Sequence, residues 1–156
     1  MKALSLLQPW ATLVAIGAKR IETRSWTPRG VQLPEAIAIH ASTGTKSLRT
    51  ADGPFYREAL AAAGYTDPEG RDLPRGRVVA VVRLDRVRTT EDIVTTSSLS
   101  PAERAFGDYS PGRFGWLTSA VLRVDEGRAL KGMLGLWALP DDVAEALADA
   151  YAKGAG

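Results

Sequence analysis

The chain has 156 residues, a length that fits one domain of ordinary size better than two. Hydrophobic residues make up 45% of it and charged residues 24%, a composition that excludes intrinsic disorder and predicts a packed core. Because the chain has no cysteine, disulfides, thiolate zinc sites and cysteine nucleophiles are excluded, and the formal net charge of +2 does not by itself indicate a polyanion ligand.

The charges are unevenly distributed along the chain. Residues 71–88 hold six arginines against Asp72 and Asp85. From residue 141 onward the charged residues are four carboxylates against the single cation Lys153. Such a run more often forms a solvated face than a recognition surface, and both interpretations stay open here. No apolar stretch approaches the ~18–20 residues of a membrane span, and the run at 3–7 is too short for an export signal. We therefore expect a cytoplasmic protein without membrane contact.

A strand, a short helix and a charged strand are predicted at the start of the chain. Residues 3–7 suit a buried strand, and Pro9 has the backbone angle of the first turn of a helix. Gly17 can take the left-handed conformation that ends this helix after about two turns. From residue 20 to 26 the residue types alternate, which predicts a strand with one charged face.

The middle of the chain is expected to hold two strands separated by a long helical excursion. Residues 36–41 and 78–87 are the strand candidates, and the second, rich in valine, is the clearer one. The excursion covers about residues 42–76. It contains one predicted helix at 54–63, which Gly64 can close.

The second half of the chain begins with a recognisable helix start. Ser100, Pro101 and Glu103 have its spacing, and the helix is expected to reach about Phe106. A loop, two apolar strands and a terminal helix follow, at residues 107–115, 116–124, 132–139 and about 141–152. Because these strands lack a regular βαβ rhythm, we expect an α+β fold: one domain over residues 1–156, with a small, mostly antiparallel sheet or barrel and peripheral helices.

The charged strand is the most informative segment for function. Its alternation predicts that Glu22, Arg24 and Trp26 project together, with Lys19 nearby at the turn from helix to strand. A carboxylate between cations stays ionised, and arginine and tryptophan offer a phosphate fork and a stacking surface. The same residues also fit a half-exposed strand with a ladder of charges, and both interpretations stay open.

Other candidate residues also have a structural alternative. His40 suits a proton shuttle, a ligand contact or a structural histidine. Gln8 and Trp10 can line a site or simply begin the helix. Arg113 and Phe114, in a glycine-flanked run, suit single-stranded nucleic acid or a nucleobase, or a loop that enters a buried strand. No phosphate-binding loop, dinucleotide fingerprint or metal-ligand motif occurs, so neither a metal nor an organic cofactor is expected.

Several segments together resemble a known family. They are Leu-Ser-Leu-Leu-Gln-Pro-Trp at 4–10, Gly-x-Lys-x-x-Glu-x-Arg at 17–24 and Ile-His-Ala-Ser at 39–42. In these the sequence resembles the ASCH domain, which is related in fold to the RNA-binding PUA domain. Residues 112–116 and 131–137 resemble the C-terminal half of bacterial members, so the resemblance covers residues 3 to about 139.

The resemblance implies a PUA-like β-barrel and a cleft that binds RNA or a nucleotide-like ligand, including single-stranded nucleic acid. The Gly-x-Lys-x-x-Glu-x-Arg element would line this cleft. The residues expected to contact the ligand are Gln8, Trp10, Lys19, Glu22, Arg24, Trp26, His40, Ser42, Arg113 and Phe114. A binding domain is therefore the first hypothesis.

The resemblance also leaves hydrolysis open as the second hypothesis. One small branch of relatives hydrolyses the amide of acetylcytidine, and another bacterial member cleaves RNA. The amidohydrolase branch has a threonine nucleophile three residues after the motif lysine, but here that position holds Glu22, and alternation turns Thr23 to the opposite face. In a metal-independent ribonuclease, Glu22 would act as base, Lys19 or Arg24 would stabilise the anion, and His40 would supply the acid.

A protein-interaction module is the third hypothesis. The acidic terminal segment suggests it, but the composition does not point to a large exposed apolar patch. No particular protein partner is indicated.

Overall fold

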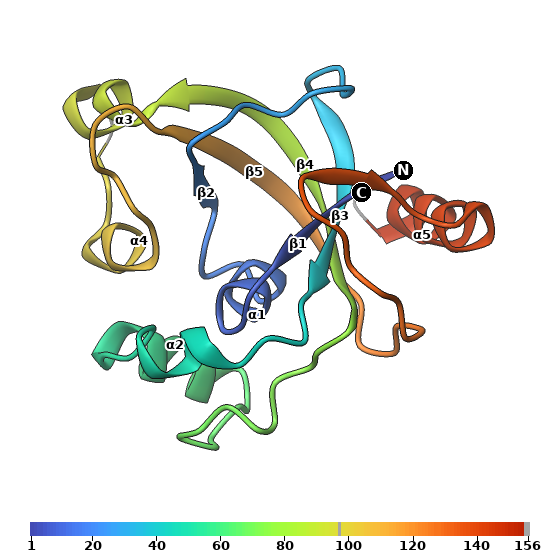
Figure 1. Cartoon of the computed structure of the whole chain (residues 1–156), viewed down its shortest axis with the longest axis horizontal. Coiled ribbons are helices and arrows are strands. Elements are labelled where there is room, and N and C mark those ends of the chain that lie inside the picture. Colours follow the sequence, from blue (N-terminus) through green and yellow to red (C-terminus); the bar gives the residue numbers. More distant parts are fainter. Residues whose placement is uncertain (97, 155–156) are drawn as a thin grey trace.

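The structure is a computed structural model that describes residues 1–96 and 98–154. Within these residues one six-stranded sheet forms in the order β2-β5-β4-β3-β1-β6 (Figure 1). Its strands are β1 (Lys2–Leu6), β2 (Ile21–Arg24), β3 (Glu35–Ala41), β4 (Arg77–Thr89), β5 (Phe114–Arg123) and β6 (Leu136–Ala138). Strands β1 and β3 run parallel, whereas the other neighbouring pairs are antiparallel. The predicted α+β fold with a mostly antiparallel sheet is confirmed, and the sheet has the form of a half-barrel.

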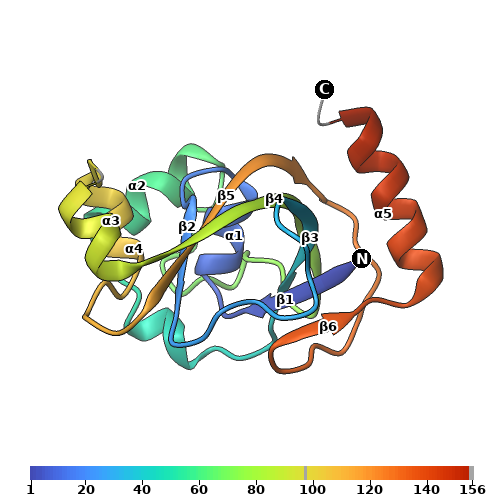
Figure 2. The ribbon, with the colours of Figure 1, turned by 90° about the horizontal axis from the view of Figure 1, so that it is seen from above.

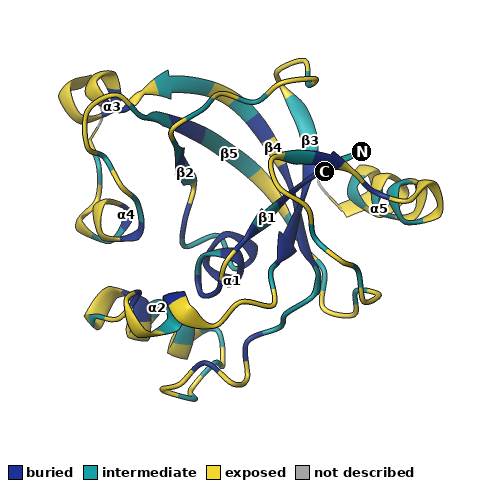
Figure 3. Cartoon of the chain, in the orientation of Figure 1, coloured by how far each residue is buried: buried dark blue, intermediate teal, exposed yellow. Residues whose placement is uncertain are grey.

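The helices surround the sheet except for α1, around which the sheet curls (Figures 1 and 2). They are α1 (Trp10–Ala15), the 3₁₀ helix η1 (Lys46–Arg49), α2 (Pro54–Ala62), α3 (Thr90–Thr96), α4 (Pro101–Phe106) and α5 (Asp141–Gly154). Helix α1 packs through Ala11, Val14 and Ala15 against the buried faces of β1, β3 and β4. Figure 3 shows this core as a continuous buried region at the centre of the fold. The first helix therefore forms part of the hydrophobic core, inside the curl of the sheet.

The two ends of the molecule carry different helices. Helices α2 and α4 meet at one end, where Tyr56 and Phe106 pack edge to face with ring centroids 4.9 Å apart. At the other end α5 packs through Val143 and Leu147 against the cluster around Trp137 (Figure 2). None of the helices in the described ranges combines the length and the apolar character needed to cross a bilayer.

The start of α4 ties this helix to the strand with the charged face. Ser100 caps α4 by accepting a hydrogen bond from the backbone N–H of Glu103 at 3.0 Å, as the sequence predicts. The carboxylate of Glu103 does not return to its own helix. It accepts from the backbone N–H groups of Arg20 (3.1 Å) and Ile21 (3.0 Å), where β2 begins. This contact holds the lysine-to-strand turn in place.

The elements differ from the sequence-based expectations at several places. Helix α3, directly after β4, and the 3₁₀ helix η1 were not predicted, and β5 begins at Phe114, inside the loop expected over residues 107–115. The strand expected over residues 132–139 is limited to Leu136–Ala138, and residues 132–135 form a loop. The strand expected to reach Trp26 ends at Arg24. Residues 132–135 do not join the sheet, and their apolar side chains face solvent; Leu134, for example, is 99% exposed.

Candidate functional site

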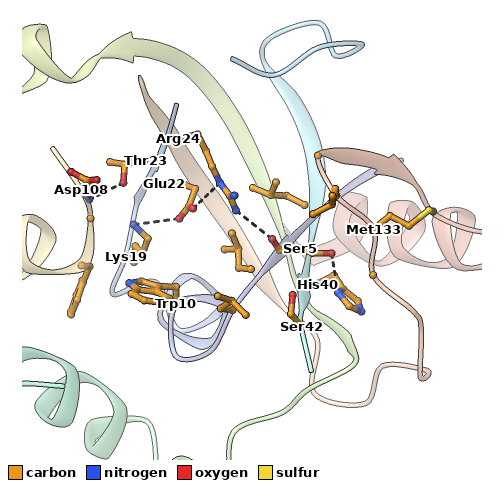
Figure 4. A pocket seen from close by; sticks show the side chains of 18 of the residues that line it. Ser5, Trp10, Lys19, Glu22, Thr23, Arg24, His40, Ser42, Asp108 and Met133 are labelled. Carbon is orange, nitrogen blue, oxygen red and sulfur yellow. Dashed lines mark hydrogen bonds and ion pairs between the residues drawn. The ribbon is translucent and has the colours of Figure 1, made fainter. Parts of the chain in front are cut away.

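A pocket of about 940 Å³ lies beside α1, between β2 and the loop at residues 130–135 (Figure 4). Strand β1 forms its floor with Leu4, Ser5 and Leu6. The segment at 105–108 and the aromatic residues of α1 and α2 form its other sides. Its lining therefore comes from segments far apart in the sequence, and the size lies within the range of small-molecule sites.

A charged cluster occupies one wall of this pocket. We call Lys19, Glu22 and Arg24 the β2 charge cluster. The Glu22 carboxylate lies 3.5 Å from Lys19 Nζ and 3.1 Å from Arg24 Nε, so it sits between two cations. Lys19 is only 1% exposed and also donates to the backbone carbonyl of Ile21. Arg24 donates from a terminal guanidinium nitrogen to the carbonyl of Ser5 at 3.3 Å, which fixes the cluster against β1.

The backbone explains why these three groups converge. Glu22 and Arg24 are two residues apart on β2 and therefore share a face. Gly17, with φ of +76°, ends α1 and leads the chain into the turn that carries Lys19. The Thr23 side chain points away from this cluster, and its hydroxyl oxygen accepts from the backbone N–H of Asp108 at 2.9 Å (Figure 4). Thr23 and Asp108 also line the pocket. Glu22 and Arg24 thus lie on one face of β2 and Thr23 on the other, as alternation along a strand predicts.

An aromatic group borders the charge cluster. Trp10 lines the pocket and packs edge to face with Tyr56, with ring centroids 6.4 Å apart. The Tyr56 hydroxyl donates to the carbonyl of Ala105 at 2.9 Å, and burial raises the pKa of Tyr56 above its ordinary value. Tyr56 is therefore a neutral apolar surface at neutral pH. Together with Phe106 these rings place flat hydrophobic area next to paired charges.

His40 is held by protein groups at both ring nitrogens. Its Nε2 lies 2.8 Å from the carbonyl of Leu130, and its Nδ1 lies 3.2 Å from the Ser5 hydroxyl. Trp137 Nε1 donates to the same hydroxyl at 3.1 Å. A carbonyl can only accept, so Nε2 carries a proton; the hydroxyl that receives the indole N–H can give its own proton to Nδ1. These hydrogen bonds fix the imidazole as a structural group at the edge of the pocket.

The loop at residues 130–135 forms the wall opposite β2. A Cβ atom at Gly132 would lie 2.6 Å from Ser5 Oγ and 2.8 Å from the His40 ring, so the loop fits closely over this network only because residue 132 is glycine. Next to it, Met133 and Leu134 are 55% and 99% exposed. The loop therefore presents an apolar tip at the pocket, together with the cation Lys131.

The structure brings together most of the residues proposed from the sequence. Those that line the pocket are Trp10, Lys19, Glu22, Arg24, His40, Ser42 and Arg113. Arg113 enters from the start of β5 and donates to the carbonyl of Thr23 at 3.3 Å, with its Nε 3.4 Å from an Asp108 carboxylate oxygen. These seven residues, proposed from the sequence, therefore lie around one pocket.

Gln8, Trp26 and Phe114 do not line the pocket. Gln8 is fully buried, donates to the carbonyl of Pro74 at 2.6 Å and accepts from the backbone N–H of Thr12 at 3.1 Å. Trp26 packs edge to face with Trp116, with centroids 4.8 Å apart, because β2 ends before it and the alternation does not continue. Phe114 packs against the main hydrophobic core. These three residues pack within the fold and do not contribute to the lining of the pocket.

Sequence reasoning missed some of the lining. Ser5, Tyr56 and Asp108 line the pocket through contacts that join distant segments, and residues 132–135, which also line it, were expected in a strand. Only Ser5 carried a local signal, as the polar residue within the apolar run at 3–7. Within the described ranges, no three histidine, aspartate or glutamate side chains gather in a way that could hold a metal ion.

The mostly antiparallel sheet, curled around its first helix, defines an α+β domain with a half-barrel sheet (Figures 1 and 2). The ASCH domain model matches residues 4–124 of this chain, and the chain belongs to the ASCH domain family. This family is PUA-like in fold and often linked to RNA binding.

Solved structures agree with this assignment. The crystal structure of ASCH from Zymomonas mobilis has a TM-score of 0.54 at 12% identity, covering 95% of this chain and 93% of that one. A serine-to-alanine mutant of the Zymomonas mobilis protein has a TM-score of 0.51 at 14% identity, covering 96% and 94%. At these identities the likeness shows the fold alone. None of the curated proteins matches this chain in sequence.

Proposed function

We propose that this ASCH domain binds one nucleotide of single-stranded RNA in the pocket beside α1. The observation that carries the proposal is the β2 charge cluster: a carboxylate fixed between a buried lysine and an arginine, next to the Trp10 ring. A nucleobase needs both parts, because its face stacks on an aromatic ring while its edge presents hydrogen-bond donors and acceptors.

The cluster supplies donors and an acceptor in fixed positions. Glu22 can accept from an exocyclic amine or ring N–H, and Arg24 can donate to a base carbonyl or a phosphate oxygen. Lys19 is already bonded within the protein, so its main effect is to hold the Glu22 carboxylate in place. An acceptor held in this way discriminates between bases, because a base that presents another acceptor there would be repelled.

The electrostatic balance of the described lining residues favours an anion. The cations Lys19, Arg24, Lys131 and Arg113 outnumber the carboxylates Glu22 and Asp108. Stacking of one base contributes about 1–3 kcal/mol, so a single nucleotide would bind weakly without phosphate contacts. We therefore expect affinity for single-stranded RNA to fall strongly with rising salt.

The direct test is a binding comparison between two glutamate variants. Glu22→Gln keeps the size of the side chain but removes its charge and one acceptor oxygen. Fluorescence anisotropy with labelled single-stranded RNA 10-mers of each base should show at least a tenfold weaker affinity for the preferred sequence and a flatter base preference. Glu58→Gln, on the exposed surface of α2, is the matched control and should bind as the parent does. Equal binding by Glu22→Gln and the parent would reject the pocket as the base-reading site.

Hydrolysis in the same pocket is the second candidate, and the 3.5 Å approach of buried Lys19 to Glu22 favours it. A carboxylate base beside cations that stabilise a developing anion suits phosphodiester cleavage. His40 supports this role less, because both ring nitrogens already have protein partners. Amide hydrolysis of acetylcytidine is less favoured still, since Glu22 stands at the nucleophile position of that branch and the Thr23 hydroxyl points away from the β2 charge cluster, toward the backbone N–H of Asp108.

Cleavage is tested with end-labelled RNA and the purified protein. If the pocket is catalytic, Lys19→Ala and Glu22→Gln should abolish cleavage that the parent and Glu58→Gln perform equally. Cleavage at the parent rate by both pocket variants would reject hydrolysis in this pocket.

The cytoplasmic location and the lack of a cofactor stay predictions from the sequence.

A further inference from the structure

A second pocket lies on the opposite side of α1 from the first. Trp10 lines the first pocket, whereas Thr12 and Ala15 line the second. Residues 10 and 12 of a helix lie about 200° apart around its axis, so they face opposite ways. The second pocket has a volume of about 530 Å³ and takes its other walls from the excursion before β4 and the end of β5.

Arginines dominate the lining of this second pocket. We call it the arginine pocket and define it by Thr12, Tyr65, Arg75, Arg77 and Arg123. Two carboxylates also line it, but both have partners. Asp72 accepts from the backbone N–H groups of Thr66 and Asp67 at 2.9 and 3.1 Å, and Asp125 pairs with Arg123 at 2.5 Å. Arg71, which also lines the pocket, pairs with Asp67 and Glu69. Arg75 and Arg77 therefore face the single remaining carboxylate of Asp72, and the lining keeps an excess of positive charge.

The arginines differ in how far they are already engaged. Arg77 makes no side-chain hydrogen bond or ion pair with any residue in the described ranges, and Arg75 uses one nitrogen, on the carbonyl of Gly70 at 3.1 Å. Arg123 is fixed as a wall, because its guanidinium donates to the Tyr65 hydroxyl at 2.9 Å and lies 5.7 Å from the Tyr65 ring centroid. The Arg77 guanidinium and the remaining nitrogens of Arg75 thus stay available beside the fixed Tyr65–Arg123 pair.

Thr12, which lines this pocket, carries a buried hydroxyl. The Thr12 side chain is 1% exposed, and its Oγ1 has no hydrogen-bond partner within the part of the chain that the structure describes. A helical threonine usually donates to the carbonyl four residues earlier, but here the Gln8 carbonyl accepts from the Ser47 hydroxyl at 2.7 Å. An unpartnered buried hydroxyl is unfavourable for the protein alone, so its place in an arginine-lined pocket points to a ligand oxygen.

We propose that the arginine pocket binds a phosphoryl group, with Arg75 and Arg77 as the charged donors and the Thr12 hydroxyl as a further donor. Guanidinium forks match the spacing of phosphate oxygens, and a hydroxyl donor adds a short bond without adding charge. The Tyr65–Arg123 pair would border whatever the phosphoryl group is attached to. The phosphoryl group can belong to an RNA backbone or to a free phosphorylated small molecule. This proposal does not depend on the base-binding role of the first pocket.

Titration with inorganic phosphate tests the chemistry shared by both sources. In ¹H–¹⁵N NMR spectra we expect saturable shifts of the amides of Arg77, Val124 and Thr12 in the parent protein. Arg77→Gln should weaken the phosphate affinity at least tenfold. The matched control is Arg86→Gln, which removes the same charge from an exposed position on the same strand, outside both pockets, and should leave the affinity within about twofold.

Thr12→Val separates a ligand role from a structural one. Valine has nearly the same shape, so the variant should bind phosphate several-fold more weakly while its melting temperature stays equal to the parent's or rises. A structural hydroxyl would give the reverse pattern, with a lower melting temperature and unchanged phosphate affinity.

Two further arms identify the source of the phosphoryl group. If Arg77→Gln also weakens binding of a single-stranded RNA 10-mer tenfold, the group belongs to the RNA backbone. If it weakens binding of a mononucleotide but not of RNA, a small phosphorylated molecule is the ligand; both outcomes support the proposal. It is overturned if phosphate gives no saturable shifts in the pocket, or if Arg77→Gln and Arg86→Gln weaken binding equally. Glu22→Gln should not change phosphate binding here, so this proposal and the RNA proposal fail separately.

Discussion

The two pockets beside α1 contrast in how their charges are compensated. In the first, the Glu22 carboxylate lies between Lys19 and Arg24, and each of the three groups has protein partners. In the arginine pocket, Arg123 pairs with Asp125, whereas Arg75 bonds only to the Gly70 carbonyl and Arg77 has no side-chain partner in the described ranges. The same helix thus separates a cluster in which every charge is paired from a pocket in which Arg75 and Arg77 have no carboxylate partner among the described residues.

This difference indicates two kinds of recognition. Paired and buried charges hold donors and acceptors in one geometry, which favours discrimination between ligands that differ by a hydrogen bond. Unpaired arginines attract any phosphoryl group and contribute mainly affinity that depends on salt. The contrast also has a consequence for stability: substitutions in the paired cluster should destabilise the fold, whereas substitutions of the unpaired arginines should not.

Lys19→Met should give the largest effect. The substitution removes a buried ammonium that contacts both Glu22 and the Ile21 carbonyl, so we expect a loss of about 3 kcal/mol in the free energy of unfolding. Urea denaturation measures it, with exposed Lys46→Met as a control that should stay within about 0.5 kcal/mol. In a double-mutant cycle with Glu22→Gln, the combined loss should be smaller than the sum. Full additivity would show that the two charges are not coupled.

Gly132→Ala should follow, at about 2 kcal/mol. The added methyl group would meet Ser5 and His40, which cannot move easily because the Trp137 indole and the Leu130 carbonyl hold them. Gly44→Ala is the matched control, because its methyl group would meet only the end of the flexible, half-exposed Leu7 side chain. Thermal unfolding should rank the control above Gly132→Ala. Equal melting temperatures would mean that the loop at 130–135 does not depend on its close fit.

Arg24→Gln and Arg77→Gln compare a paired with an unpaired arginine directly. Arg24 binds both Glu22 and the Ser5 carbonyl while 27% exposed, so its loss should destabilise the fold by about 1 kcal/mol. Arg77→Gln should change the stability by less than about 0.5 kcal/mol. Chemical denaturation of both variants measures the two changes in the free energy of unfolding. A larger loss for Arg77→Gln would reverse the contrast between the two pockets.

Local sequence pattern was sufficient to predict the β2 charge cluster. The alternation within residues 20–24 places Glu22 and Arg24 on one face, and Gly17 marks the turn that carries Lys19. The same rule fails at Trp26, because alternation predicts sidedness only while the strand continues and β2 ends at Arg24. Where a strand stops depends on its neighbour, and β5 pairs with β2 only between Ile21 and Arg24.

Features made by tertiary contacts could not be predicted from sequence. The apolar letters of residues 132–135 fit a buried strand, yet they form a loop because Gly132 packs over His40 and Leu134 faces solvent. The arginine pocket joins Thr12, Arg77 and Arg123, which the sheet brings together from three separate segments. Nothing near Thr12 in the sequence signals its role, since its importance arises from burial without a partner.

The smallest effect should come from Asp108, at the edge of the first pocket. Hydrogen bonds from the side chain and backbone of Ser110 hold the pKa of this carboxyl below its usual range, and the Arg113 charge adds to this. A folded-state pKa below the unfolded value stabilises the protein above about pH 4, and this contribution disappears as the pH falls through the lowered pKa. The parent should therefore be slightly more stable than Asp108→Asn at pH 7, and the difference should vanish once the pH has fallen below the lowered pKa of Asp108. Urea denaturation across this range measures it, and a difference that stays constant with pH would show that the carboxylate charge at this edge of the pocket does not contribute to stability.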